Sequence, residues 1–157
     1  MFPSSLSGVV PIEAMRGDDP LDTELLRADY EKARSFLLRH KWCFGLGEAY
    51  FGEGVGGIVS IFLVQIDPVP ICVDQWLWVI VGDIPPAYLV TDGSPTPMAA
   101  LKTYIGLGRR WVELAYTSET SPEVMPVEVP ADPYHAEILE RRLNILEEIL
   151  FGAKEQN

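Results

Sequence analysis

The stretch that decides the fold is Trp76-Leu77-Trp78-Val79-Ile80-Val81, an unbroken apolar run. Side chains of a β-strand alternate between the two faces of its sheet, so Trp76, Trp78 and Ile80 share one face and the residues between them share the other. Both sets are apolar, and both faces must therefore be covered. The pattern predicts a central strand shielded on each side by helices or by a second subunit.

The segments around this strand predict a small antiparallel sheet. Ile58–Val64 repeats the apolar pattern, with Ser60 as its polar break. We expect a hairpin of strands 43–51 and 58–66 joined by a glycine-rich turn over 52–57, then a third strand over 74–81 and a short fourth strand over 87–90. Pro68 and Pro85 follow two of these strands and end them, because proline donates no backbone hydrogen bond.

Three helices are predicted beside the sheet. Asp19-Pro20 supplies the capping residue and the first-turn proline of a helix over about 20–41. Residues 97–115 carry a wide apolar stripe, which indicates heavy burial. Asp132-Pro133 repeats the cap-plus-proline start for a last helix that ends at Gly152. The predicted fold class is α+β: a three- to four-stranded, mainly antiparallel sheet with helices on both faces.

The length of 157 residues suits one domain. We expect a single α+β domain over 1–157, with 1–18 as an irregular N-terminal arm, 117–131 as an extended, proline-containing connector and 153–157 as a frayed tail. Cys43 and Cys72 are expected to be buried free thiols. No signal peptide and no bilayer-spanning run is found, so a cytoplasmic location is expected.

The net charge is strongly negative, with 23 acidic and 12 basic residues and a formal charge of -11. This charge repels nucleic acid and anionic membranes, and it attracts basic partners. Basic residues concentrate in 16–41 and 102–110, whereas 111–140 holds acids and no Lys or Arg. The connector acids expected to bind a basic partner are Glu113, Glu119, Glu123, Glu128 and Asp132. The alternative is that they belong to an ordinary solvated loop.

The glycine pattern Gly52-x-Gly54-x-x-Gly57 matches the glycine consensus of two kinds of nucleotide-binding loop. The dinucleotide-binding loop needs a helix after the glycines, whereas a strand is predicted here. The kinase loop needs a nearby lysine with H-R-D and D-F-G motifs, which this chain lacks. A hairpin turn is therefore predicted.

Sequence motifs for catalysis or metal binding are missing. His40 and His135 are the only histidines, and neither has the spacing of a metal site, so no metal and no cofactor is predicted. The sequence contains no G-x-S-x-G motif for a hydrolase. An alternative function is a small-molecule-binding protein or enzyme with a pocket between the sheet and the 98–115 helix, formed by Asp83, Tyr88 and His135.

Residues 76–85, W-L-W-V-I-V-G-D-I-P, resemble a strand signature of small uncharacterised bacterial α+β proteins. That signature is W-V-I-x-G-D-[IL]-P followed by a helix that ends near an aromatic residue, which here would be Trp111. The resemblance implies a fold and no activity. In size and acidity the chain also resembles, more loosely, bacterial toxin-immunity proteins.

Together these features favour a non-enzymatic, acidic interaction protein. An immunity or inhibitor protein that binds a basic protein is the concrete form of this hypothesis, and electrostatic steering would make its binding sensitive to salt. A homodimer that covers one apolar sheet face is compatible with the same pattern.

Overall fold

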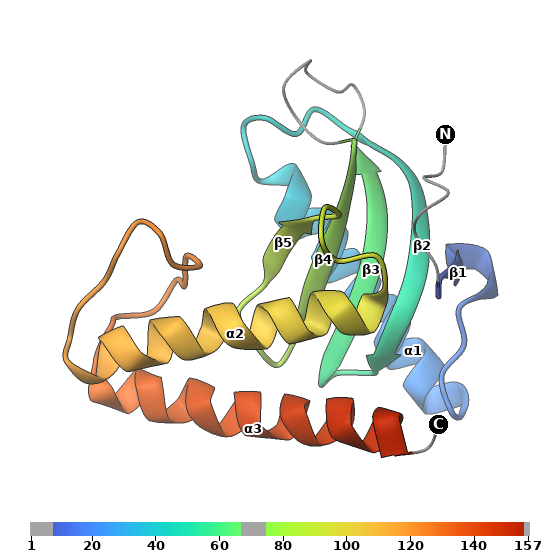
Figure 1. The fold of residues 1–157 in the computed structure, drawn as a ribbon. Coiled ribbons are helices and arrows are strands. Elements are labelled where there is room, and N and C mark those ends of the chain that lie inside the picture. Colours follow the sequence, from blue (N-terminus) through green and yellow to red (C-terminus); the bar gives the residue numbers. More distant parts are fainter. Residues whose placement is uncertain (1–7, 67–74, 156–157) are drawn as a thin grey trace. The chain divides into compact units, whose positions relative to one another are not determined.

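The computed structural model describes the backbone of residues 8–66 and 75–155 and the side chains to residue 150 (Figure 1). Its contacts divide the chain into two compact units, unit 1 within Met1–Ala100 and unit 2 within Leu101–Asn157. That the two form the single domain expected from the sequence stays a prediction. None of the helices in the described ranges carries an apolar stretch long enough for a membrane span.

Unit 1 is built around a five-stranded antiparallel sheet whose strands follow one another in chain order (Figure 1). The strands are β1 (Val10–Pro11), β2 (Leu46–Val55), β3 (Val59–Ile66), β4 (Trp76–Gly82) and β5 (Ala87–Val90). The α+β class and the antiparallel pairing are confirmed. The predicted count of three to four strands is wrong, because β1 adds a fifth strand.

The strand β1 lies in the N-terminal arm that was predicted to be irregular. It pairs Val10 with Phe51 of β2 and is followed by a short 3-10 helix, η1 (Ile12–Ala14). Met15, directly after η1, is buried in the core of unit 1. A two-residue strand that ends in proline has no alternating pattern, so only its contact with β2 defines it.

The first strand of the hairpin is shifted along the chain relative to the prediction: it begins at Leu46 rather than at residue 43. β2 continues through Gly52 and Gly54 to Val55, and its pairing with β3 shifts register between Phe51 and Glu53. The turn therefore covers residues 56–58 rather than 52–57, and we call it the glycine turn. The predicted strand 87–90 is confirmed as β5. The predicted strand 74–81 is confirmed from Trp76 onward, and Asp74 lies outside the described residues.

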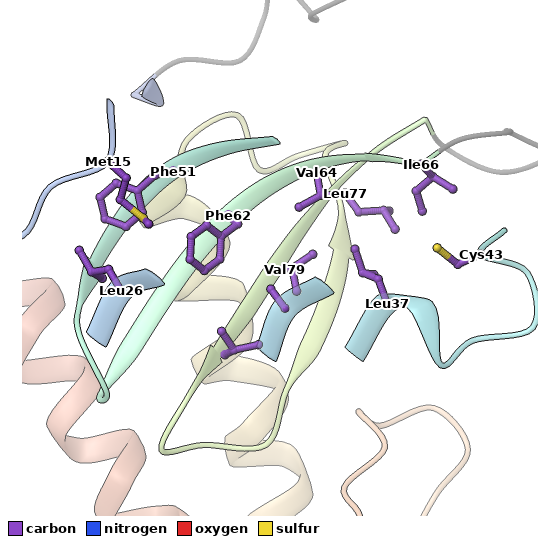
Figure 2. Close-up of a cluster of buried hydrophobic side chains, with 12 residues drawn as sticks. Met15, Leu26, Leu37, Cys43, Phe51, Phe62, Val64, Ile66, Leu77 and Val79 are labelled. Atoms are coloured by element: carbon purple, nitrogen blue, oxygen red, sulfur yellow. The ribbon is translucent and has the colours of Figure 1, made fainter. Parts of the chain in front are cut away.

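One face of the sheet packs against α1 (Pro20–Leu38), which contacts β2, β3 and β4. Cross-strand pairs such as Phe62 with Val79 lie on this face. Leu26 and Leu37 of α1 meet them in the core that Figure 2 shows. The helix starts at the predicted residue, with Asp19 accepting a hydrogen bond from the Asp22 N–H at 2.8 Å, but it ends at Leu38 rather than near residue 41.

The opposite sheet face is also apolar and buried, as the alternating pattern predicted. Leu63, Trp78 and Ile80 each have an exposed fraction of 0%. The indole N–H of Trp78 donates to the carbonyl oxygen of Ser94 at 2.7 Å, so the chain after β5 meets this face. Helical cover is confirmed for the α1 face, and a helix over the Trp78 face stays a prediction.

Unit 2 contains an antiparallel helical hairpin. α2 (Pro97–Tyr116) begins at the end of unit 1 and continues through unit 2, and α3 (Pro133–Glu155) follows the connector. Arg109 of α2 donates to Glu147 at 2.8 Å and to Asn144 at 2.9 Å, both on α3. A Cβ at Gly108 would lie 2.9 Å from Leu143, so glycine permits close packing there. α3 continues past Gly152, against the prediction, because one glycine costs a helix only about 1 kcal/mol.

Candidate functional site

The acids predicted to bind a partner fall into three environments in unit 2. Glu119, Glu123 and Glu128 are exposed in the connector between α2 and α3. Glu113 lies on α2 instead, where its carboxylate is 3.2 Å from the guanidinium of Arg110. Asp132 caps the start of α3. The grouping of all these acids as one connector set is therefore corrected: only the first three lie in the connector with exposed side chains.

The connector is held by local contacts and is not uniformly extended. Ser118 has a φ of 57°, and the N–H of Glu119 donates to the Leu114 carbonyl at 2.8 Å, which closes the end of α2. In the middle of the connector, Met125 is buried, with an exposed fraction of 6%. A turn occurs over 122–123, and the chain bends at 124 and over 128–129. These contacts give the segment a defined conformation.

The far end of the connector is fixed by a capping interaction. The Asp132 carboxylate accepts the His135 backbone N–H at 2.8 Å, and the same oxygen lies 2.8 Å from His135 Nδ1. The backbone hydrogen bond, followed by the bond from the ring, holds the pKa of Asp132 below its ordinary value. Asp132 is thus engaged within its own helix.

The exposed connector acids have few cations near them in sequence. No Lys or Arg occurs from Trp111 to Glu140, and the basic residues that flank this stretch already pair, Arg110 with Glu113 and Arg141 with Glu137. The carboxylates of Glu119 and Glu123 have no ion-pair partner among the residues that the structure describes. These two side chains are therefore open to a cationic ligand.

Two exposed apolar side chains lie close in sequence to these acids. Val129 has an exposed fraction of 43% and Tyr134 of 68%. We define the connector surface as Glu119, Glu123, Glu128, Val129 and Tyr134. Val129 and Tyr134 were not among the residues predicted to bind a partner. The available signal was their position: Val129 directly follows Glu128, Tyr134 follows Asp132-Pro133, and no apolar period in this proline-rich segment requires their burial.

The alternative pocket residues belong to both units. Asp83 lies in the turn after β4, where its backbone N–H donates to the Ile58 carbonyl at 3.0 Å. Tyr88 pairs with Val79 and so faces α1, where its ring is 5.2 Å from that of His40 and 5.1 Å from that of Trp42. His135 belongs to unit 2. A pocket shared by Asp83, Tyr88 and His135 stays a prediction.

Cys43 does not have the properties of a reactive thiol. It is a buried free cysteine in the α1-side core, and burial raises the pKa of its thiol. Cys72 lies outside the described residues. Over the described part of the chain, no three His, Cys, Asp or Glu side chains lie together as a metal site would require.

The glycine motif makes a structural contact with α1. Asp29 of α1, with an exposed fraction of 1%, accepts the Gly57 N–H at 3.0 Å and the Ser60 hydroxyl at 2.7 Å. Asp22 accepts the Gly56 N–H at 2.7 Å. A Cβ at Gly56 would lie 2.5 Å from that of Leu25, so only glycine fits against the helix without movement. The turn thus binds its own chain through two carboxylates.

Asp29 was not among the residues predicted to have a role. Its available signal was spacing, because Asp29 lies on the same helical stripe as Leu26 and Ala33. An acid on an apolar stripe needs a buried partner. Comparison with known proteins adds no further assignment: no protein-family model, curated protein or solved structure matches this chain.

Proposed function

We propose that this chain is a protein-binding module that takes a basic partner on the connector surface. The observation that carries the proposal is the combination found there: Glu119 and Glu123 are exposed without an ion-pair partner among the described residues, and the same part of the chain exposes Val129 and Tyr134 and is held by its own hydrogen bonds. An inhibitor or immunity role in the cytoplasm is the concrete form of this function.

The charge of the connector surface supports a cationic partner. Glu119 and Glu123 lie in a stretch without Lys or Arg, in a chain whose net charge is -11. Like charges around them raise the negative potential, which steers a basic protein toward this surface and disfavours nucleic acid. Screening by salt reduces such steering, so the association rate should fall as ionic strength rises.

The exposed apolar side chains of the connector surface supply binding energy that charge alone does not. Rim charges mainly set the rate and orientation of binding, whereas buried aromatic side chains contribute most of the binding energy. Tyr134, exposed at 68%, is the candidate anchor of this kind. The buried Met125 and the closed ends of the connector reduce the ordering cost of binding, because the segment already has a defined conformation.

The test compares two triple variants of equal charge. E119Q/E123Q/E128Q neutralises the connector surface, and E24Q/E53Q/D92N neutralises exposed acids of unit 1. Each immobilised protein is exposed to a cell lysate at about 0.1 M and about 1 M salt, where the screening length is about 10 Å and about 3 Å. Captured proteins are identified by mass spectrometry, and each basic one is purified for titration calorimetry.

We expect the wild-type protein and the unit 1 variant to bind one basic protein with Kd values within about threefold of each other, and the connector variant to bind it at least about tenfold more weakly. Tyr134→Ala should increase the dissociation rate with little change in the association rate. Equal binding by both triple variants, or capture of no basic protein at low salt, would contradict the proposal.

A further inference from the structure

Unit 1 contains a groove of about 460 Å³ between α1 and the end of β4. One wall carries Ala28, Lys32 and Ser35 of α1 and Arg39, which caps the end of α1; the four recur at helical spacing. Val81 and Ile84, exposed at 2% and 8%, form an apolar floor. The volume lies within the range of small-molecule sites, about 300–1,000 Å³.

The groove lies beside a cationic stretch of an acidic chain. Residues 32–47 contain Lys32, Arg34, Arg39 and Lys41 and no acid. Lys32 and Arg39 both line the groove and are seven residues apart, which places them about two helical turns from each other, or about 10 Å along the axis. Ser35 lies between them on the same face. Its hydroxyl adds a hydrogen-bond donor between two cations.

Of these two cations, Arg39 lies beside apolar surface and Lys32 lies beside a carboxylate. The Arg39 guanidinium carbon lies 5.6 Å from the centre of the Phe36 ring, which also lines the groove. Lys32 lies 3.8 Å from the Asp29 carboxylate, and its side chain is 60% exposed. Glu31 is the acid in the groove lining, and its carboxylate is 3.8 Å from Arg34. The groove therefore combines an apolar floor with a net positive rim.

We propose that this groove binds a small amphipathic carboxylate, with the carboxylate at Ser35 between Lys32 and Arg39 and an aromatic or branched apolar body against Phe36, Val81 and Ile84. Charge complementarity selects the anion, because a charge-assisted hydrogen bond is about twice as strong as a neutral one. The floor selects the apolar body through its burial. The site lies in unit 1 and is independent of the connector surface.

The probe is 4-phenylbutyrate, with two matched ligands. The neutral 4-phenylbutanamide keeps the apolar body and removes the charge, and acetate keeps the charge and removes the body. We expect 4-phenylbutyrate to bind with a Kd on the order of 0.1–1 mM, as few atoms make contact, and both matched ligands to bind at least about fivefold more weakly. Binding is measured by ligand-observed NMR and by chemical shifts of the α1 amides.

Variants locate the binding in the groove. R39Q and K32Q should each weaken binding of 4-phenylbutyrate by about three- to tenfold, since each removes one charge-assisted contact. S35F should abolish it by filling the groove. K41Q is the matched control, because Lys41 carries the same charge outside the groove lining, and it should bind within about twofold of wild type.

The charge variants keep the test decisive if S35F fails to fold. Weaker binding by R39Q with unchanged binding by K41Q would support the proposal. Equal losses in R39Q and K41Q would show general attraction to a basic surface and would overturn it. Equal affinity for the acid and the amide, or no saturation by 4-phenylbutyrate at about 10 mM, well above the expected Kd, would overturn it as well.

Discussion

Two acidic regions of this molecule use the same chemical group in opposite ways. In unit 1, Asp22 and Asp29 of α1 accept hydrogen bonds from the glycine turn of their own chain. In unit 2, Glu119 and Glu123 of the connector are exposed and have no ion-pair partner within the described residues. The difference teaches that the number of acids does not identify a binding surface. What identifies it is whether the carboxylates are already engaged.

Burial explains why the two regions should respond differently to mutation. A buried carboxylate is stable only with hydrogen-bond donors around it, and those donors lose their partner when the carboxylate is removed. An exposed carboxylate is hydrated, and its removal leaves no buried group unsatisfied. Mutations should therefore change stability in the first region and binding in the second.

The largest effect is expected for Asp29→Ala. The substitution leaves the buried Ser60 hydroxyl and the half-buried Gly57 N–H without their acceptor, and a buried unsatisfied group costs about 1–3 kcal/mol. We expect the free energy of unfolding to fall by about 3 kcal/mol in urea titrations followed by tryptophan fluorescence. The control is Glu31→Ala on the exposed side of α1, which should stay within about 0.5 kcal/mol of wild type. A loss below about 1 kcal/mol for Asp29→Ala would show that the carboxylate does not hold the turn.

A smaller loss is expected for Gly56→Ala, which tests the same contact from the turn. The new Cβ would lie 2.5 Å from the Leu25 Cβ and 2.7 Å from the Asp22 carbonyl oxygen, so helix and turn must separate. We expect a cost of about 2 kcal/mol in the same titration. At Gly93, where φ is +78° and no atom lies within 4 Å of the added Cβ, alanine should cost about 1 kcal/mol through backbone conformation alone. Equal losses at the two positions would mean that the close approach to α1 is unimportant.

Asp132 is intermediate between the two regions, because it lies at the edge of the connector but already accepts hydrogen bonds from His135. Its hydrogen bonds from His135 lower its pKa from 3.8, so the group is more acidic in the folded protein than in the unfolded one. Its contribution to stability is present above the unfolded value and is lost as pH falls through the lower folded value. Asp132→Asn keeps a capping oxygen and removes the titration. Hydrogen exchange at the first amides of α3 should accelerate below about pH 4 in the wild type, beyond its intrinsic pH dependence, and should not do so in the variant.

Most of the sheet could be predicted from the sequence, because the apolar pattern of each strand and the residues that end it are local features. β3 and β4 are apolar on both faces, and proline and aspartate end the segments, so both strands are visible without tertiary information. The caps at Asp19 and Asp132 likewise set the starts of α1 and α3. β1 could not be predicted, because a two-residue strand exists only through its partner.

The candidate sites could be predicted less well, because contacts between distant segments determine them. Asp29 and Gly57 are 28 positions apart, and nothing in the sequence links them. The acidic character of the connector could be predicted from the sequence. Residue type did not distinguish Glu113, which pairs with a cation on α2, from Glu119, which has no ion-pair partner among the described residues. The groove beside Lys32 and Arg39 needs the packing of α1 on β4, and a pattern of residue types does not give that geometry.

The smallest effect on stability is expected for the connector, and this result would separate the two regions most clearly. E119Q/E123Q/E128Q should change the free energy of unfolding by less than about 0.5 kcal/mol, because the substitutions are exposed and conservative in shape. A slight gain is consistent with relief of repulsion in an acidic segment. A loss above about 1 kcal/mol would place these carboxylates in the folded framework, as with Asp29, and would remove the basis for a partner-binding surface. Unchanged stability together with weaker partner binding would show that the connector acids serve association, while the α1 acids serve the fold.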